Sequence, residues 1–542
     1  MYNPSLDDLL QVFKEILPNF EPRSNQLETA QTIIKQFAEK NHVVLEAPTG
    51  AGKSIIAMII AKWFESQENR TVITSVTKSL QDQYLKDFGN HISDVRSSSN
   101  EIYRCEHGLT RKDPDCVSVR SKKGCNSAKA CPYKKATKAF FENSIGMTNL
   151  HFCSLVPHIS KTHLLILDEC HELSNIVISN ASFKLTELNA SFLDLLIKDN
   201  KKKKQLVDEY GKVLDSLRAV PENTVFEVEV DDSAINACLI MQDFVKDLDK
   251  RIKQGSFNLE SKNDTVKKAY SHLKSKERDL STYIKSFRSK FVCQPGLEFK
   301  PIYASHFTNQ MVFKKSSKFL HMSATICGFE QYCQEVGIDV EDSVFVEADH
   351  TIPIDRRKVI LDDVAWMSFK NYNTDIKKTC SKIKQLIHKH DNVNTIIHTT
   401  SYSRANDINK AIPSVQVYKT HPEIVNYLNS GDRDRFVASP SITAGIDAKD
   451  DMCRLNIVVK LAFPSLGDPR MKYLADVNPD LYNLSVVRNL VQACGRSTRS
   501  QTDHSTTYII DGNANRLFDQ YEHMFPNWFK QSCFNKNQYK IF

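Results

Sequence analysis

Short runs of β-branched residues alternate with amphipathic stretches in the first hundred residues. Residues 26–40 place apolar side chains at helical spacing, and the run HVVLE at 42–46 stops before Pro48. A strongly apolar stretch at 55–64 predicts a buried helix, and residues 71–76 predict a second short strand. Strand, loop, helix and strand in this order are typical of a parallel sheet.

The same alternation returns further along the chain. Strand-like runs at 163–167 and 318–322 end directly before a polar residue, Asp168 in one case and Ser323 in the other. More strand-like runs follow after residue 359, at 394–398, 436–439, 455–461 and 507–510. The earlier runs predict one parallel sheet, and the later runs predict a second parallel-sheet domain.

Two stretches interrupt this alternation. Residues 96–145 are polar and rich in Cys and Lys, with few periodic apolar positions. Residues 185–290 carry long amphipathic helical patterns and a KKKK run at 201–204, which is more typical of a solvated helix end than of a binding site. A hairpin strand is expected at Phe226, Val228 and Val230. We interpret both stretches as insertions, the second of them mostly helical.

Composition narrows the class of protein. The chain has 542 residues, 41% hydrophobic and 25% charged, which fits several globular domains. Lys and Arg exceed Asp and Glu by 72 to 65, and the resulting charge of +7 permits a nucleic-acid partner without requiring one. The N-terminus lacks a basic secretory segment, and no apolar run approaches the roughly 20 residues of a membrane span. We therefore expect a soluble cytoplasmic protein (in the host cytoplasm if viral) with no membrane partner.

A phosphate-binding loop is predicted between the first strand and the helix that follows it. Glycines at 50 and 52 let the backbone wrap around phosphate, and the backbone N–H groups then meet the phosphate oxygens. Lys53 would reach the β and γ phosphates of ATP, and Ser54 would hold Mg²⁺. The residues assigned to ATP are Ala47, Pro48, Thr49, Gly50, Ala51, Gly52, Lys53 and Ser54.

An acidic pair follows the strand at 163–167. Asp168 would complete the Mg²⁺ shell, and Glu169 would polarise the attacking water as a general base. His171 would connect the nucleotide site to the rest of the protein. An Asp-Glu pair alone is weak evidence, but together with the phosphate-binding loop it predicts ATP hydrolysis.

Three motifs resemble those of superfamily 2 helicases. They are DECH at 168–171, similar to the DEAH-type box, SAT at 323–325, similar to motif III, and QACGRSTR at 492–499, similar to motif VI. The resemblance implies that Gln492, Arg496 and Arg499 face the nucleotide from a second domain. Arginines in this place can neutralise the charge that builds on the γ phosphate.

Other segments resemble the DinG/XPD family in particular. These are RSNQ at 23–26, TNLH at 148–151, AGID at 444–447 and KLAFPSLGDP at 460–469. The first implies that Arg23 and Gln26 contact adenine. The third resembles motif V and implies that Asp447 lies at the ATP site, although Ala444 replaces the acid usual in that motif.

Four cysteines, Cys105, Cys116, Cys125 and Cys131, lie close together in the first insertion, among many Lys and Arg residues that would attract a phosphate backbone. Four thiolates can hold a [4Fe–4S] cluster or a tetrahedral Zn²⁺, and free thiols are a third possibility. The lack of paired CxxC spacings favours the iron–sulfur cluster. The DinG/XPD resemblance also implies such a cluster at this place in the chain.

Taken with this resemblance, the chain is expected to be an α/β protein with two RecA-like P-loop motor domains, an inserted Fe–S domain and an inserted helical arch-like domain. The expected ranges are 1–95, 146–184 and 291–345 for the first motor domain, 96–145 for the cluster domain, 185–290 for the arch-like domain and 346–542 for the second motor domain.

The resemblance implies an ATP-dependent DNA helicase of 5′-to-3′ polarity. It would be a monomeric motor on single-stranded and forked DNA, with ATP, Mg²⁺ and a [4Fe–4S] cluster. An RNA or RNA–DNA hybrid motor stays open, as does a nucleic-acid-binding ATPase switch that does not unwind. Only 46 residues precede the phosphate-binding loop, too few for an appended exonuclease domain, so none is expected there.

Overall fold

The computed structural model describes most of the chain. The described residues are 2–23, 25–111, 116, 131–156, 162–254, 257, 264–367, 371–431, 433–441, 448, 450–498, 502–537 and 539–541.

Two seven-stranded parallel sheets form the frame of the molecule. The first has the order β11-β1-β10-β5-β2-β4-β3 and the second the order β14-β15-β13-β16-β17-β12-β18. The first sheet comprises β1 (His42–Glu46), β2 (Thr71–Ser75), β3 (Ser93–Val95), β4 (Ile145–Asn149), β5 (Thr162–Asp168), β10 (Ser316–Ser323) and β11 (Ser343–Glu347). The second comprises β12 (Val359–Ala365), β13 (Thr395–His398), β14 (Val415–Gln416), β15 (Phe436–Ser439), β16 (Leu455–Val458), β17 (Thr506–Asp511) and β18 (Cys533–Asn535).

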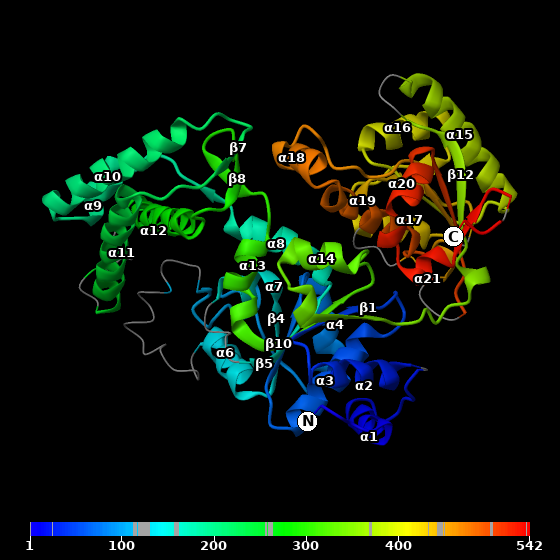
Figure 1. The fold of residues 1–542 in the computed structure, drawn as a ribbon, viewed down its shortest axis with the longest axis horizontal. Helices are drawn as coiled ribbons and strands as arrows, with labels where there is room; N and C mark the ends of the chain where they lie inside the picture. The colour runs from blue at the N-terminus through cyan, green and yellow to red at the C-terminus, as the bar shows by residue number, and fades with distance from the viewer. Residues whose placement is uncertain are drawn as a thin grey trace.

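Helices surround each sheet. Around the first are α1 (Leu6–Ile16), α2 (Gln26–Gln36), α3 (Lys53–Ser66), α4 (Lys78–Phe88), α6 (Pro132–Glu142), α7 (Leu150–Leu155), α8 (Leu173–Ala181), α13 (Ser305–Met311) and α14 (Phe329–Val336). Around the second are α15 (Tyr372–Lys389), α16 (Tyr402–Ala411), α17 (His421–Leu428), α18 (Pro469–Val477), α19 (Pro479–Cys494), α20 (Asn513–Tyr521) and α21 (Asn527–Lys530). We call these two parts the first body and the second body, the lower and the upper right parts of Figure 1.

Short 3₁₀ turns join several of these elements. They lie at Glu101–Tyr103, Cys170–Glu172, Phe313–Lys315, Val340–Asp342, Ile354–Arg356, Asp450–Met452 and Glu522–Met524.

Several strands of the parallel sheets are buried on both faces. All five residues of β1 and of β2 are buried, as expected of strands with helices on each side. On one face, Leu45 and Ile73 pack with residues of α1, α2 and α3, including Phe13 and Phe64. The strands expected from the sequence therefore exist, and the α/β class is confirmed. The helix expected at 26–40 ends earlier, at Gln36.

The second insertion is a separate helical layer, drawn in green at the upper left of Figure 1. It contains α9 (Ala190–Leu196), α10 (Asn200–Arg218), α11 (Asp232–Lys253) and α12 (Asp264–Lys285). A small antiparallel sheet, β6-β9-β8-β7, joins it to the first body. The strands are β6 (Phe183–Lys184), β7 (Val225–Glu227), β8 (Lys290–Gln294) and β9 (Glu298–Pro301).

The strand expected near Phe226 is present but is not part of a local hairpin. β7 pairs with β8, with Phe226 opposite Phe291, and two helices separate these strands in the chain. The local pattern could not reveal this pairing, because the partner strand lies beyond the helical insertion. In the part of the chain that the structure describes, no helix is both long and apolar enough to cross a membrane.

Candidate nucleotide site between the two bodies

The loop at residues 47–54 leaves the end of β1 and enters α3. Gly50 and Gly52 have φ values of 86° and 82°, a left-handed conformation that glycine adopts without steric cost. Ala47 and Pro48 are buried, whereas Thr49, Gly50 and Ser54 are partly exposed. This backbone directs the N-terminus of α3 toward the opening of the loop, as phosphate binding requires.

Two residues ahead of β1 support this loop. Gln26 is 2% exposed, and its Nε2 donates to the carbonyl of Ala51 at 3.2 Å. Its Oε1 accepts from the backbone N–H of Arg23 at 3.0 Å, and the Arg23 guanidinium donates to the carbonyl of Gly50. The structure thus brings Arg23 and Gln26 to the phosphate-binding loop, while their contact with adenine stays a prediction.

The acidic pair lies at the end of β5, two strands from β1. Asp168 is 3% exposed, and it accepts the Tyr84 hydroxyl at 2.9 Å and the backbone N–H of Glu169 at 3.0 Å. Lys53 Nζ lies 3.9 Å from Glu169 Oε1 and 3.3 Å from the carbonyl of Ala47. The lysine of the loop and both acids therefore share one site.

The two carboxyl groups differ in their titration. Burial, followed by the charge of Glu169, raises the pKa of Asp168 to about 6. Burial also opposes ionisation of Glu169, but Lys53 and His171 outweigh it and lower the pKa of Glu169 to about 2. Asp168 is thus a buried carboxylate that a cation would stabilise, and Glu169 is held ionised, as a general base requires.

His171 links this pair to the second body. Its Nδ1 lies 2.8 Å from Ser323 Oγ and 3.3 Å from Glu169 Oε2. Gln492 Nε2 of α19 donates to His171 Nε2 at 2.9 Å and to Thr325 Oγ1 at 3.1 Å. The two ring nitrogens of His171 thus contact Ser323 and Glu169 on one side and Gln492 on the other, so the imidazole lies between the two bodies.

The end of α19 also reaches the phosphate-binding loop. Thr49 Oγ1 donates to the carbonyl of Gly495 at 3.4 Å. Burial opposes the ionisation of Glu169, and the charge of Arg496 adds to the larger effects of Lys53 and His171 in lowering its pKa. Gly495 and Arg496 thus lie beside the loop and the acidic pair, while their approach to a nucleotide stays a prediction. Arg499 and Asp447 lie outside the described residues, and so does Ala444.

Two residues of this region escaped the sequence analysis. Tyr84 lies on α4, and its hydroxyl reaches Asp168 only because β2 and β5 are neighbours in the sheet. Arg488 lies one turn before Gln492 on α19 and is 7% exposed. The sequence does contain a signal for Arg488, which is a charged residue within a mostly apolar helix. Such a side chain is buried only when it is paired, so its position indicates a buried partner.

The cysteines of the first insertion differ from the others in burial. Cys105, Cys116 and Cys131 are partly exposed, whereas all other described cysteines are buried. Tyr103 and Tyr133 stack edge to face with ring centroids 5.4 Å apart, which brings the chain near Cys105 to the start of α6 beside Cys131. Among the described residues no metal-binding group of His, Cys, Asp or Glu is formed, and Cys125 lies outside them.

Cys153 and Cys170 are fully buried and pack within the core of the first body. Burial raises the pKa of the Cys153 thiol to about 11 and that of Cys170 further. Both thiols thus have the surroundings of packing residues.

Two family models match the chain. Residues 19–206 match the family described as type III restriction enzyme, res subunit, and residues 369–532 match the family described as helicase C-terminal domain. The first range contains the phosphate-binding loop and the acidic pair, and the second contains Gln492 and Arg496.

Curated relatives match over short stretches. The 3′-5′ exonuclease DinG of Bacillus subtilis (strain 168) is 31% identical over 75 residues, 14% of this chain and 8% of that protein. The ATP-dependent DNA helicase DinG of Escherichia coli (strain K12) is 35% identical over 81 residues, 14% of this chain and 11% of that protein. The alignments thus span only about a tenth of the relatives' length.

Solved structures share the fold over nearly the whole chain. An XPD helicase matches with a TM-score of 0.57 and 15% identity, covering 95% of this chain and 100% of that one. Xpd4 of S. tokodaii matches with a TM-score of 0.57 and 11% identity, over the same shares of both chains. The two parallel sheets thus correspond to the two RecA-like domains of such proteins. The chain therefore has the fold of these XPD structures, and parts of it are similar to the helicase C-terminal family and to two DinG proteins.

Proposed function

We propose that this protein is an ATP-dependent DNA helicase that translocates 5′ to 3′ on single-stranded DNA and unwinds forked duplexes as a monomer. The observation that carries the proposal is the hydrogen bond between His171 and Gln492. It joins the acidic pair of one RecA-like domain to motif VI of the other, so that a change at the nucleotide would alter how the two bodies meet. The name of the Escherichia coli relative supports DNA as the substrate.

In this proposal each residue has a role at ATP. Lys53 and the loop backbone bind the phosphates, while Ser54 and Asp168 hold Mg²⁺, which would neutralise charge on the phosphates. Glu169 orients the attacking water and accepts its proton, and Arg496 and Arg499 approach the γ phosphate from the second body. Arg23, Gln26 and Asp447 complete the nucleotide site. A cytoplasmic location and the domain ranges given above are part of the same proposal.

The helicase activity is tested by strand displacement. Duplexes with a 5′ or a 3′ tail, made of DNA, RNA or both, would be mixed with protein, ATP and Mg²⁺. We expect displacement of 5′-tailed DNA and none with Lys53→Ala, which lacks the phosphate contact. ATP hydrolysis that nucleic acid stimulates, without displacement of any duplex, would favour the ATPase switch. Displacement of RNA duplexes alone would favour the RNA motor. Shortening of the labelled strand would reveal a nuclease instead.

We further propose that Cys105, Cys116, Cys125 and Cys131 hold a [4Fe–4S] cluster. Cysteine is among the most buried residue types, so partly exposed thiols that are close in sequence suggest a role as ligands. The contact between Tyr103 and Tyr133 supports the approach of the first and last of them. These thiolates would bind the cluster, and the cluster would fix the fold of the insertion.

Metal analysis of the purified protein tests this second proposal. We expect about four iron and four sulfide per chain, with a visible absorbance that is lost in Cys105→Ser. The buried Cys380→Ser is the matched control and should retain the iron. Colourless protein that contains zinc would reject the cluster.

A further inference from the structure

Arg488 and Gln492 lie one turn apart near the end of α19 and share one face of that helix, and Arg496 follows in the turn directly after it. Gln492 and Arg496 meet the nucleotide site, as described above. Arg488 belongs to no motif, yet its side chain also crosses from the second body into the first.

The contacts of Arg488 are direct and buried. Its Nη1 donates to Glu335 Oε2 at 2.7 Å, and its Nε donates to the carbonyl of Ile326 at 3.2 Å. The Arg488 side chain is 8% exposed and that of Glu335 20%. A buried guanidinium is stable only with its partners in place, so these contacts determine where α19 lies against the first body.

The turn that Arg488 contacts is also tied to the phosphate-binding loop. The backbone N–H of Cys327, next to Ile326, donates to Glu46 Oε1 at 2.9 Å. Glu46 is the last residue of β1, directly before the loop. Cys327 has a φ of 57°, which a non-glycine residue adopts only when its surroundings hold it there. Arg488 and the strand that begins the loop therefore hold the same turn.

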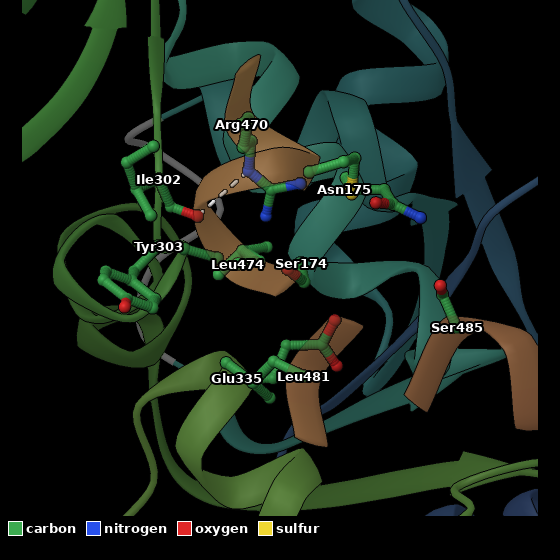
Figure 2. A pocket seen from close by; sticks show the side chains of 11 residues that line it. Ser174, Asn175, Ile302, Tyr303, Glu335, Arg470, Leu474, Leu481 and Ser485 are labelled. Atoms are coloured by element: carbon green, nitrogen blue, oxygen red, sulfur yellow. Dashed lines mark hydrogen bonds between the residues drawn. The ribbon is translucent and has the colours of Figure 1, made fainter. Parts of the chain in front are cut away.

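Glu335 faces a second arginine of the second body. Arg470 of α18 is 7% exposed, and its Nε donates to the carbonyl of Ile302 at 3.0 Å. Arg470 and Glu335 line one cavity of about 50 Å³ between the two bodies, and Figure 2 shows both side chains there. Their charges interact across it, although no hydrogen bond joins them in the part of the chain that the structure describes. One carboxylate of the first body thus attracts two arginines of the second.

We propose that Arg488 and Glu335 form an interdomain anchor that positions Gln492 and Arg496 at the nucleotide site. The proposal rests on the function proposed above, because it assumes that these two residues act on ATP. Arg488 is a positioning residue in this arrangement, since it reaches the site only through α19 and the turn at Ile326. Its Nη2 is buried and has no hydrogen-bond partner among the described residues, so it retains a donor for a contact that forms when the bodies move together.

The anchor predicts a separation of ATP binding from ATP hydrolysis. In Arg488→Ala the phosphate-binding loop is unchanged, so the Kd of a fluorescent ATP analogue should stay within about threefold of the wild type. The kcat of hydrolysis should fall by about tenfold or more, because Gln492 and Arg496 are no longer held in place. Glu335→Gln keeps an acceptor for Arg488 but removes the charge, and it should give an intermediate loss.

Exchanging the residues at positions 488 and 335 distinguishes a positioning role of the ion pair from a contribution to packing alone. The double variant Arg488→Glu, Glu335→Arg should recover at least part of the kcat that each single variant loses. The matched control is Arg218→Ala, which breaks an exposed ion pair with Glu187 on the helical insertion and should leave kcat unchanged. Wild-type kcat in both Arg488→Ala and Glu335→Gln would overturn the anchor, and so would equal losses of kcat and analogue binding.

A distance measurement keeps this test separate from the proposed function. One dye is placed on each body, so that energy transfer between the dyes reports the distance between the bodies. Binding of the ATP analogue should change this energy transfer in the wild type and change it less in Glu335→Gln. If the wild-type protein hydrolyses no ATP, the proposed function fails while the dyes still report on the anchor. If hydrolysis is normal and the dyes respond equally in both proteins, the anchor fails and the function stands.

Discussion

Gly52 is the residue at which the phosphate-binding loop becomes α3. A Cβ at this position would lie 2.2 Å from Gln26 Nε2, and the φ of 82° is unfavourable for any other residue. Gly52→Ala should therefore displace Gln26 and weaken the binding of an ATP analogue by about tenfold or more, at a cost of roughly 1–2 kcal/mol. Titration of analogue fluorescence measures this effect. Gln26→Ala should show a smaller loss, and unchanged affinity in Gly52→Ala would contradict the close contact.

Tyr84 should matter through its hydroxyl alone. Tyr84→Phe keeps the buried ring but removes the hydrogen bond to Asp168, which orients that carboxylate. We expect the kcat of hydrolysis to fall by about threefold to tenfold, since a typical hydrogen bond contributes about 0.5–1.5 kcal/mol net. A kcat measurement at saturating Mg²⁺ tests this. Tyr103→Phe, in the first insertion, is the matched control and should hydrolyse ATP normally.

Glu46 should make stability depend on pH. Burial raises its pKa in the folded protein from 4.5 to about 8. Between these values the folded state holds a proton that the unfolded state has lost, so the free energy of unfolding decreases as pH rises. Glu46→Gln has no carboxyl group to titrate and so lacks this decrease. The difference in the free energy of unfolding between Glu46→Gln and the wild type should therefore grow from pH 5 to about pH 9, to on the order of 1 kcal/mol or more. Urea unfolding at several pH values would detect it, with the exposed Glu39→Gln as the control.

The residues of the site were predictable where local sequence determines their place. Lys53 and Asp168 follow strong strand patterns, and Gln492 lies in the segment that resembles motif VI, so their places in the chain could be inferred. Tyr84 and Arg488 could not, because their roles depend on which strands are neighbours and on how two bodies meet. No local pattern contains that information.

At the scale of elements, α6 and β4 meet where only glycine fits. A Cβ on Gly146 of β4 would lie 2.6 Å from the Phe140 ring of α6. Gly146→Ala should shift this helix and lower the free energy of unfolding by about 1–3 kcal/mol. Thermal unfolding measures the change.

Gly211 is the control for this substitution. It lies within α10, and a Cβ there would meet nothing within 4 Å. Gly211→Ala should therefore stabilise the protein by about 0.5–1 kcal/mol through helix propensity. A destabilised Gly211→Ala, or an unaffected Gly146→Ala, would contradict these packing arguments.

The parallel strands that the sequence predicts, such as β1 and β2, are buried throughout and rich in β-branched residues. The pairing of β7 was missed because register depends on the partner strand, and that partner follows two long helices. The extent of the antiparallel sheet was missed for the same reason, since β6 has only two residues. Short strands leave too few positions for a period to be recognised.

At the scale of the whole molecule, residues of both bodies form the proposed nucleotide site. An ATP analogue with Mg²⁺ should raise the midpoint of thermal unfolding, because a ligand at 100 times its Kd stabilises by about 2.7 kcal/mol. Gln492→Ala removes two hydrogen bonds between the bodies, to His171 and to Thr325, so the analogue should stabilise the second body less in this variant. Differential scanning calorimetry can resolve the two bodies. An equal shift of both transitions in wild type and variant would contradict a shared site.

The antiparallel sheet has a consequence for how this architecture can change. Phe183 and Lys184 of β6 pair with Phe299 and Glu298 of β9, so the chain leaves for the helical insertion and returns at neighbouring positions. Everything between them could be exchanged for a short turn without breaking a strand of either parallel sheet. The junction is thus a point at which the helical module could be enlarged, shortened or removed while both parallel sheets stay intact.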